Sequence, residues 1–319
     1  MARYRNALPQ LAGGLFLTDG GIETALIFHE GFDLPHFAAF DLLRQARGRD
    51  ALWAYYARYA EIARAKGLGF ILESPTWRAS SDWGERLGYS AEELAEANRQ
   101  AIALLHDLRL GFETAAAPMV VSGCVGPRGD GYDPRRKMTS VEAEAYHGRQ
   151  IAVFAESGAD MVTAITMNYA EEAIGLARAA AAASLPVVIS FTVETDGRLP
   201  TGQTLKDAIE WVDEATRAAP AYYMINCAHP DHFAGAMAGQ EGWMQRLRGL
   251  RANASRLSHA ELDEAEDLDA GDPQELGRLH GALRQRFGQL NVFGGCCGTD
   301  HRHVAAIAGA VTEAAEAVA

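Results

Sequence analysis

The stretch Asn291-Val292-Phe293-Gly294-Gly295-Cys296-Cys297-Gly298 joins a short apolar run to a glycine-rich turn that carries two adjacent thiols. The apolar run predicts a short buried strand, and the residues from Asp300 onward predict the start of a helix. Packing alone explains two thiols at the C-terminal tip of a strand poorly. This stretch therefore indicates a strand–turn–helix unit with a site placed where the strand ends.

Seven further apolar runs precede this one, and helix-like stretches separate them. The predicted strands are residues 15–18, 69–73, 118–122, 161–166, 186–191, 222–226, 247–252 and 291–293. Between them apolar residues recur at helical spacing, as in residues 50–66. Alternating strands and helices predict a parallel sheet, and eight repeats predict an α/β fold with a single (β/α)8 TIM barrel over residues 1–319. An open doubly wound sheet, with its site at a topological switch point, is the alternative.

A third thiol, Cys227, follows the predicted strand 222–226. In a barrel the C-terminal ends of the strands meet at one rim, so we expect Cys227, Cys296 and Cys297 to be near neighbours there. Three thiolates can hold Zn²⁺ and leave one coordination position open. The flanking glycines remove side chains beside the thiols and permit unusual backbone angles. The alternatives are that Cys227 is a small buried residue and that Cys296-Cys297 is a strained vicinal pair.

Composition limits the class of protein. Of the 319 residues 48% are hydrophobic, enough for a sizeable core, and the net charge of −13 argues against nucleic acid and anionic membranes as partners. No run reaches the ~18 apolar residues of a membrane span, and the N-terminus lacks an apolar signal core, so we expect a cytoplasmic protein. Four cysteines in a chain of this length indicate metal or redox chemistry rather than a disulfide framework. The acidic segment 261–272 is expected to be a solvated connection, with calcium binding as the alternative.

The chain resembles the homocysteine S-methyltransferase family over nearly its whole length. The specific matches are Asn226-Cys227 and Gly294-Gly295-Cys296-Cys297-Gly298-Thr299, which resemble the zinc motifs of the family. Supporting matches are residues 19–26, 76–80 and 122–127. The family includes betaine–homocysteine methyltransferase, the enzymes that use S-methylmethionine, and the homocysteine module of cobalamin-dependent methionine synthase.

The resemblance implies a reaction and a set of contacts. Cys227, Cys296 and Cys297 would bind zinc, and the open position would take the thiol of homocysteine, which zinc deprotonates and activates toward a methyl group. Asp19 matches the aspartate that holds the amino group of homocysteine, and the backbone amides around Gly20-Gly21 would receive its carboxylate. The substrate-binding candidates are Asp19, Gly20, Gly21, Trp77 and Asn226, and Glu73, Glu194, Thr166 and Asn253 are further candidates.

The sequence departs from the family pattern at the fourth strand. Many relatives carry a second glutamate there that contacts the substrate amine, whereas this chain has Ile165. Glu73 and Glu194 lie near other strand ends and are candidates to replace it. Trp77 could contact a cationic donor through its ring face. Further expectations are that Asn168 and Tyr169 line the pocket, that Asn253 matches an asparagine of the relatives, that Cys124 is a small buried residue, and that His229, His232, His301 and His303 are not ligands.

Three functions fit these sequence features. The first is zinc-dependent transfer of a methyl group from a sulfonium or quaternary ammonium donor to homocysteine, giving methionine. The second keeps the metal site but uses a different thiol or selenol acceptor, as the absence of the fourth-strand glutamate suggests. The third is a thiol-rich zinc-binding protein, or a redox sensor that uses Cys296-Cys297. The length leaves no room for folate and cobalamin modules, so S-methylmethionine, S-adenosylmethionine and betaine-like compounds are the donors considered, and the oligomeric state is left open.

Overall fold

The computed structural model describes residues 2–237, 242–265 and 267–317. Within those residues eight parallel strands close into a barrel in the order β1 to β8. Phe16 of β1 pairs with Gly69 of β2 on one side and with Val292 of β8 on the other, which closes the ring. The strands are β1 (Phe16–Leu17), β2 (Gly69–Glu73), β3 (Met119–Val125), β4 (Met161–Met167), β5 (Val187–Thr192), β6 (Tyr222–Asn226), β7 (Leu247–Ala252) and β8 (Val292–Gly295). The predicted (β/α)8 barrel is confirmed.

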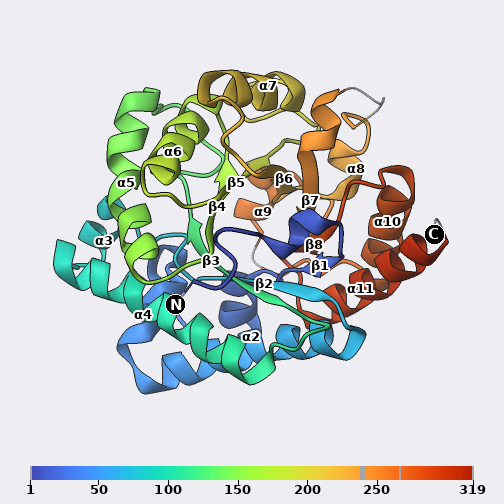
Figure 1. Cartoon of the computed structure of the whole chain (residues 1–319), viewed down its shortest axis with the longest axis horizontal. Helices are drawn as coiled ribbons and strands as arrows, with labels where there is room; N and C mark the ends of the chain where they lie inside the picture. Colours follow the sequence, from blue (N-terminus) through green and yellow to red (C-terminus); the bar gives the residue numbers. More distant parts are fainter. Residues whose placement is uncertain (1, 238–241, 266, 318–319) are drawn as a thin grey trace.

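Helices surround the ring of strands (Figure 1). The longer ones are α2 (Ala46–Lys66), α4 (Ala91–Phe112), α5 (Ser140–Glu156), α6 (Ala170–Ala182), α7 (Leu205–Thr216), α10 (Pro273–Arg286) and α11 (His301–Glu316). Shorter ones are α1 (Ile22–Thr24), α3 (Ser81–Arg86), α8 (Pro230–Phe233), α9 (His259–Asp263), η1 (Pro9–Ala12), η2 (Ala25–His29), η3 (Pro35–Phe37), η4 (Ala39–Arg44) and η5 (Gly242–Arg246). Local sequence signals mark the helix ends. Capping boxes begin α4 and α5, and Gly67, with a left-handed φ of 62°, ends α2.

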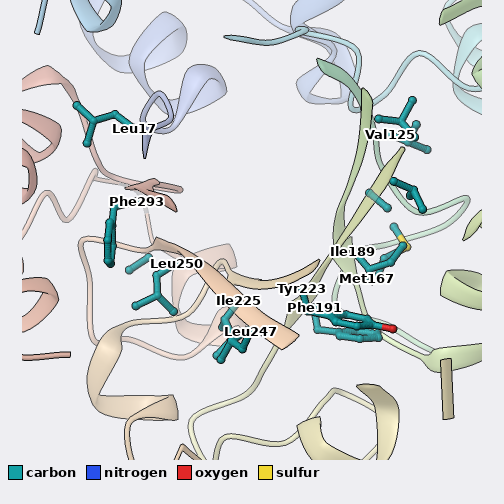
Figure 2. Packing of buried hydrophobic residues seen from close by; sticks show 14 of the residues in the cluster. Leu17, Val125, Met167, Ile189, Phe191, Tyr223, Ile225, Leu247, Leu250 and Phe293 are labelled. Atoms are coloured by element: carbon teal, nitrogen blue, oxygen red, sulfur yellow. The ribbon is translucent and has the colours of Figure 1, made fainter. Parts of the chain in front are cut away.

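Side chains alternate along each strand between the helix layer and the barrel interior. The outer set packs against the helices, and Figure 2 shows members such as Phe191, Ile225 and Phe293 spaced around the ring. A separate apolar cluster fills the barrel interior toward the N-terminal ends of the strands: Phe16, Ile71, Val120, Met161, Val188, Tyr222, Met224 and Val292. The interior at the N-terminal ends of the strands is thus filled with apolar side chains, and the C-terminal ends of the strands form the opposite rim.

The third strand is longer than the sequence indicated. It continues past the predicted end at residue 122 to Val125, so that Gly123 and Cys124 lie within it. Gly123 does not interrupt the strand because the ring of Phe154 from α5 packs where its Cβ would be. The glycine marks a close approach of helix to strand, not a turn.

Candidate active site

Three thiols gather at the C-terminal rim of the barrel. Cys227 directly follows β6, and Cys296 and Cys297 directly follow β8. Strand β7 lies between these strands and holds both turns: the Cys227 N–H donates to the Arg251 carbonyl at 3.1 Å, and the Cys296 N–H to the Ala252 carbonyl at 2.8 Å. The three Sγ atoms lie within 4.8 Å of one another. The structure therefore brings together the residues that the sequence singled out as metal ligands.

The glycines beside the thiols act in two different ways. A Cβ on Gly294 would collide with the hydroxyl of Thr18, and one on Gly295 with the hydroxyl of Thr299. Gly298 has a left-handed φ of 77°, which strains any residue with a side chain. The expected backbone freedom thus applies to Gly298, whereas Gly294 and Gly295 allow neighbouring segments to approach closely.

Two residues at the rim hold a left-handed backbone that non-glycine residues rarely adopt. Cys227 has a φ of 53° and Thr166 a φ of 66°, the latter in an irregular part of β4 between Ala164 and Met167. The side chain of Asn226 accepts from the Thr166 N–H and donates to its Oγ1, both at 3.0 Å. Strain supported in this way is concentrated at functional sites. Asn226, predicted to contact the substrate, is engaged in holding Thr166 beside Cys227.

The chemistry of the three thiols suits zinc. Thiolate sulfur is a soft ligand that Zn²⁺ accepts readily, and three protein ligands leave one tetrahedral position for another donor. Cys227 and Cys296 are paired through their sulfurs, with Cα atoms 5.4 Å apart, a backbone separation that a disulfide also accommodates. Cys297 is a free thiol in the described chain, and burial raises its pKa to about 11. With all three cysteines reduced, their sulfurs offer three metal ligands. The pair Cys227–Cys296 differs from the vicinal Cys296–Cys297 disulfide that the redox-sensor alternative requires.

The nearby histidines are engaged elsewhere. His229 caps the N-terminus of α8, and His232 contacts a backbone carbonyl. His303 belongs to the capping box of α11, and His301 is exposed on its first turn. Among the described residues, the three thiols are the group of metal-binding side chains close enough to share an ion. Cys124 is buried in β3, and burial raises the pKa of its thiol well above the ordinary value.

Asp19, expected to hold the substrate amine, is deeply buried and already has two partners. Arg251 Nη2 donates to its Oδ1 at 2.6 Å, and the Tyr55 hydroxyl donates to its Oδ2 at 3.0 Å. Burial raises the pKa of Asp19, and the charge of Arg251 opposes that rise. The negative charge of Asp19 is therefore balanced by a cation of the protein. Sequence reasoning missed Arg251, although two arginines within one predicted strand, Arg248 and Arg251, were a visible signal.

The turn after Asp19 is packed against the start of α11. The Gly21 N–H donates to the Thr299 carbonyl at 3.1 Å, so this amide already has an acceptor. A Cβ on Gly20 would lie 2.8 Å from the Tyr59 hydroxyl, and one on Gly21 would press on the Cys296 carbonyl. Both glycines thus allow the turn to lie against the thiol-bearing segment.

The carboxylates considered as replacements for the missing glutamate occupy different environments. Glu194 follows β5, is partly exposed, and lies 3.2 Å from His259 Nδ1. Glu73 is the last residue of β2 and is 3% exposed. It shares the interior face of β2 with Ile71, two residues earlier. Ile165 is 7% exposed, so the position that carries the glutamate in relatives is apolar and nearly buried here.

Aromatic and polar side chains predicted to line the pocket have structural partners. The guanidinium of Arg78 lies 3.9 Å from the ring centroids of both Trp77 and Trp83, so one face of Trp77 is covered by a cation of the protein. The Asn168 amide donates to two backbone carbonyls of the β3–α5 loop, and the Tyr169 hydroxyl accepts from the backbone at the end of that loop. Asn253 is buried, and its backbone N–H donates to the carbonyl of residue 228.

The β3–α5 loop reaches over the thiols. Tyr132 of this loop packs against His259, with ring centroids 4.0 Å apart. Burial raises the pKa of the Cys297 thiol, and a hydrogen bond from Tyr132 opposes that rise. His259 Nε2 in turn lies 2.6 Å from the Cys227 carbonyl. Neither residue was predicted, because Tyr132 lies in an irregular loop and His259 begins the short helix α9, where no long periodic pattern marks either of them.

The acidic segment after β7 serves local structure. Asp269 accepts from the Ser255 hydroxyl at 2.6 Å, and Asp272 caps the N-terminus of α10. Residue 266, also within the segment considered for calcium, lies outside the described residues. Across the described chain, no helix has the length and apolar character needed to cross a membrane.

Comparison with known proteins identifies this arrangement. A family model described as homocysteine S-methyltransferase matches residues 16–311. The chain belongs to the homocysteine S-methyltransferase family. It is therefore a methyltransferase, and its thiol-bearing barrel rim is the candidate active site of that family's fold.

Individual relatives are distant but cover nearly the whole chain. Homocysteine S-methyltransferase 4 of Zea mays is 24% identical over 331 residues, which span 95% of this chain and 91% of the maize protein. The homocysteine methyltransferase MmuM of Escherichia coli, in its oxidized form, has a similar structure, with a TM-score of 0.73, 18% identity, and coverage of 96% of this chain and 99% of that one. Its metallated form matches with the same TM-score at 19% identity, over 96% and 99% of the two chains. These structural matches support the barrel fold.

Proposed function

We propose that this protein is a zinc-dependent methyltransferase that forms methionine from homocysteine within a single barrel domain. Cys227, Cys296 and Cys297 would hold Zn²⁺. The observation that carries the proposal is the convergence of these thiols from β6 and β8 at the C-terminal rim of a family barrel. Bound zinc lowers the pKa of a thiol that joins it and keeps that sulfur nucleophilic at neutral pH.

The residues around the thiols position them and limit the access of water. Asn226 and Thr166 fix the end of β6, and β7 fixes both thiol-bearing turns through backbone hydrogen bonds. Tyr132 and His259 cover one side of the thiol cup, which is the cluster of Cys227, Cys296 and Cys297, and the nearly buried Ile165 adds apolar surface. This environment suits a cationic donor, because the new S–CH₃ bond would form as the bond between the methyl group and the donor atom breaks. The donor atom keeps the electron pair of that bond, which neutralises its positive charge. We therefore favour a sulfonium or quaternary ammonium donor.

The full chain, purified under reducing conditions, tests this proposal. Homocysteine is held fixed while S-methylmethionine, S-adenosylmethionine and betaine are supplied in turn, and methionine is measured by mass spectrometry. We expect methionine with at least one cationic donor and its loss in Cys296→Ala. Cys124→Ala is the matched control, because Cys124 is buried in β3 apart from the thiol cluster. Activity retained in Cys296→Ala would contradict the proposal.

A different thiol or selenol acceptor is the second candidate. Two observations favour it: Ile165 replaces the family glutamate, and the charge of Asp19 is already balanced by Arg251. Competition between homocysteine, selenohomocysteine and simple thiols decides between the two. Equal use of a simple thiol and homocysteine would favour this second acceptor class.

A further inference from the structure

The half of the barrel interior nearest the thiols is polar, whereas the half nearest the N-terminal ends of the strands is apolar. Its buried inward-facing side chains lie between the apolar cluster and the thiols: Thr18, Glu73, Ser122, Thr163, Ser190, Asn226 and Arg251. Several of them satisfy one another. Ser122 and Thr163 hydroxyls lie 2.8 Å apart, and the Ser190 hydroxyl donates to Asn226 Oδ1 at 2.7 Å. Glu73 and Arg251 are the charged members of this layer.

Glu73 is buried without a matching donor. Among the described residues, neither of its carboxylate oxygens has a hydrogen-bond partner of normal geometry, although the hydroxyls of Ser122 and Thr163 are close enough to lower its pKa. Burial is the larger effect and raises the pKa of Glu73 to about 7. An unpaired buried carboxylate costs stability. Such a group is more readily explained by a ligand that it binds than by the fold.

Arg251 has one unused donor on the same layer. Its Nη2 is bound to Asp19, and its Nε donates to the Gly295 carbonyl at 3.2 Å. Within the described chain its Nη1 is buried and has no hydrogen-bond partner. Arg251 and Glu73 attract each other electrostatically, and no ion pair between them is formed among the described residues.

The register of the barrel places these groups next to the thiols. Arg251 pairs with Asn226 on β6 and with Gly294 on β8. Asn226 immediately precedes Cys227, and Gly294 lies two residues before Cys296. Arg251 therefore lies in the barrel interior, beside the strand residues that come just before the three thiols. Glu73 and Arg251 Nη1 then offer one unpaired negative and one unpaired positive group beneath a site for sulfur.

We propose that Glu73 and Arg251 form the recognition site for the head group of the acceptor, with Glu73 taking an ammonium group and Arg251 Nη1 a carboxylate. This inference rests on the proposed function, because it assumes that the acceptor sulfur sits at the thiol cup. The acceptor class is then a thiol with an α-amino acid head, as in homocysteine. Glu73 then supplies the carboxylate that many relatives carry at the position of Ile165. Asp19 serves as the partner that orients Arg251.

Glu23 is the competing carboxylate. It lies in α1, is half-buried, and interacts electrostatically with Asp19, Arg251 and Arg78. Unlike Glu73 it is not enclosed in the interior layer. Glu23→Gln is therefore the matched control for Glu73→Gln, since both remove one negative charge near Arg251 without changing side-chain size.

The test uses zinc-loaded full-length protein and measures binding by calorimetry and methyl transfer by kcat/KM. The acceptors are homocysteine, 4-mercaptobutyrate, which lacks the ammonium group, and 3-mercaptopropylamine, which lacks the carboxylate. For Glu73→Gln we expect full zinc content and a Kd for homocysteine weakened about 10- to 100-fold, with less than about threefold change for 4-mercaptobutyrate. For Arg251→Lys, which keeps a cation for Asp19, we expect weaker binding of both carboxylates and unchanged binding of 3-mercaptopropylamine.

Three results would overturn the inference. The first is equal weakening of all acceptors in Glu73→Gln, which indicates a structural role. The second is no weakening at all. The third is a selective loss of homocysteine in Glu23→Gln instead. If the wild-type protein binds none of these thiols, the proposed function fails and the inference fails with it, whereas wild-type binding without the Glu73 selectivity leaves the function standing and removes the inference alone.

Discussion

Replacing Arg251 with methionine removes the cation that balances buried Asp19. The pair is made by Arg251 Nη2 and Asp19 Oδ1 at 2.6 Å, with both side chains almost fully buried. Removing one partner of a buried ion pair leaves an uncompensated charge and typically costs about 3–5 kcal/mol. An unfolding entropy of about 2.1 cal/mol/K per residue gives about 0.7 kcal/mol/K for 319 residues, so a loss of about 4 kcal/mol lowers Tm by about 6 °C.

The assay is thermal and urea unfolding of wild-type and variant proteins at pH 8 and pH 5. Burial already raises the pKa of Asp19, and without Arg251 its pKa rises further. Asp19 then protonates at the lower pH, so the destabilisation of Arg251→Met is expected to shrink between pH 8 and pH 5. Arg248→Met is the matched control, because Arg248 is a less buried arginine on the same strand, and we expect its effect to stay within about 0.5 kcal/mol.

A double variant measures the interaction itself. Asp19→Asn combined with Arg251→Met removes both charges, so its loss of stability is expected to be smaller than the sum of the single losses by about 2 kcal/mol. A Tm for Arg251→Met within about 1 °C of wild type at pH 8 would refute the reasoning, because burial without compensation must cost stability. Additive losses in the double variant would show that the two residues do not act as a pair.

The remaining predictions concern acid stability and the thiol turn. Burial lowers the pKa of His280 to about 4, so the stability that its neutral form supports is complete above about pH 6.5 and falls as the pH drops toward 4. Between pH 7 and pH 4.5, urea unfolding is expected to show wild type losing about 2 kcal/mol more stability than His280→Leu. Equal losses in the two proteins would contradict this. Gly298→Ala meets both a left-handed φ and the Asp269 carbonyl, so a destabilisation of about 2–3 kcal/mol is expected. Gly309→Ala, in open space on α11, is the control and is expected to be neutral or stabilising by up to about 1 kcal/mol.

The barrel was predictable because its signals are local. Each strand is a short apolar run, and each long helix carries periodic apolar residues, so the alternation is visible without any contact information. The thiol cup was predictable for a related reason. Cys227, Cys296 and Cys297 all sit directly after strands, and a barrel brings such positions to one rim.

Other parts of the site depend on register and on irregular segments. Asp19 and Arg251 are 232 positions apart, and their pairing follows from closure of β8 on β1, which no local pattern reveals. Tyr132 lies in a loop whose backbone carbonyls accept hydrogen bonds from the Asn168 side chain, so its approach to Cys297 has no periodic signal. The role of Gly294 was also beyond sequence reasoning, since it depends on the position of the Thr18 hydroxyl and not on backbone freedom.

The central claim is that three thiolates form one zinc site, and metal content tests it most directly. Wild-type protein and the variants Cys227→Ala, Cys296→Ala, Cys297→Ala and Cys124→Ala are purified under reducing conditions, and zinc is measured by inductively coupled plasma mass spectrometry. We predict about one zinc per chain in wild type and Cys124→Ala, and less than about 0.1 in each of the other variants. Full zinc content in any one of those three variants, or metal-free wild-type protein with reduced thiols, would contradict the account.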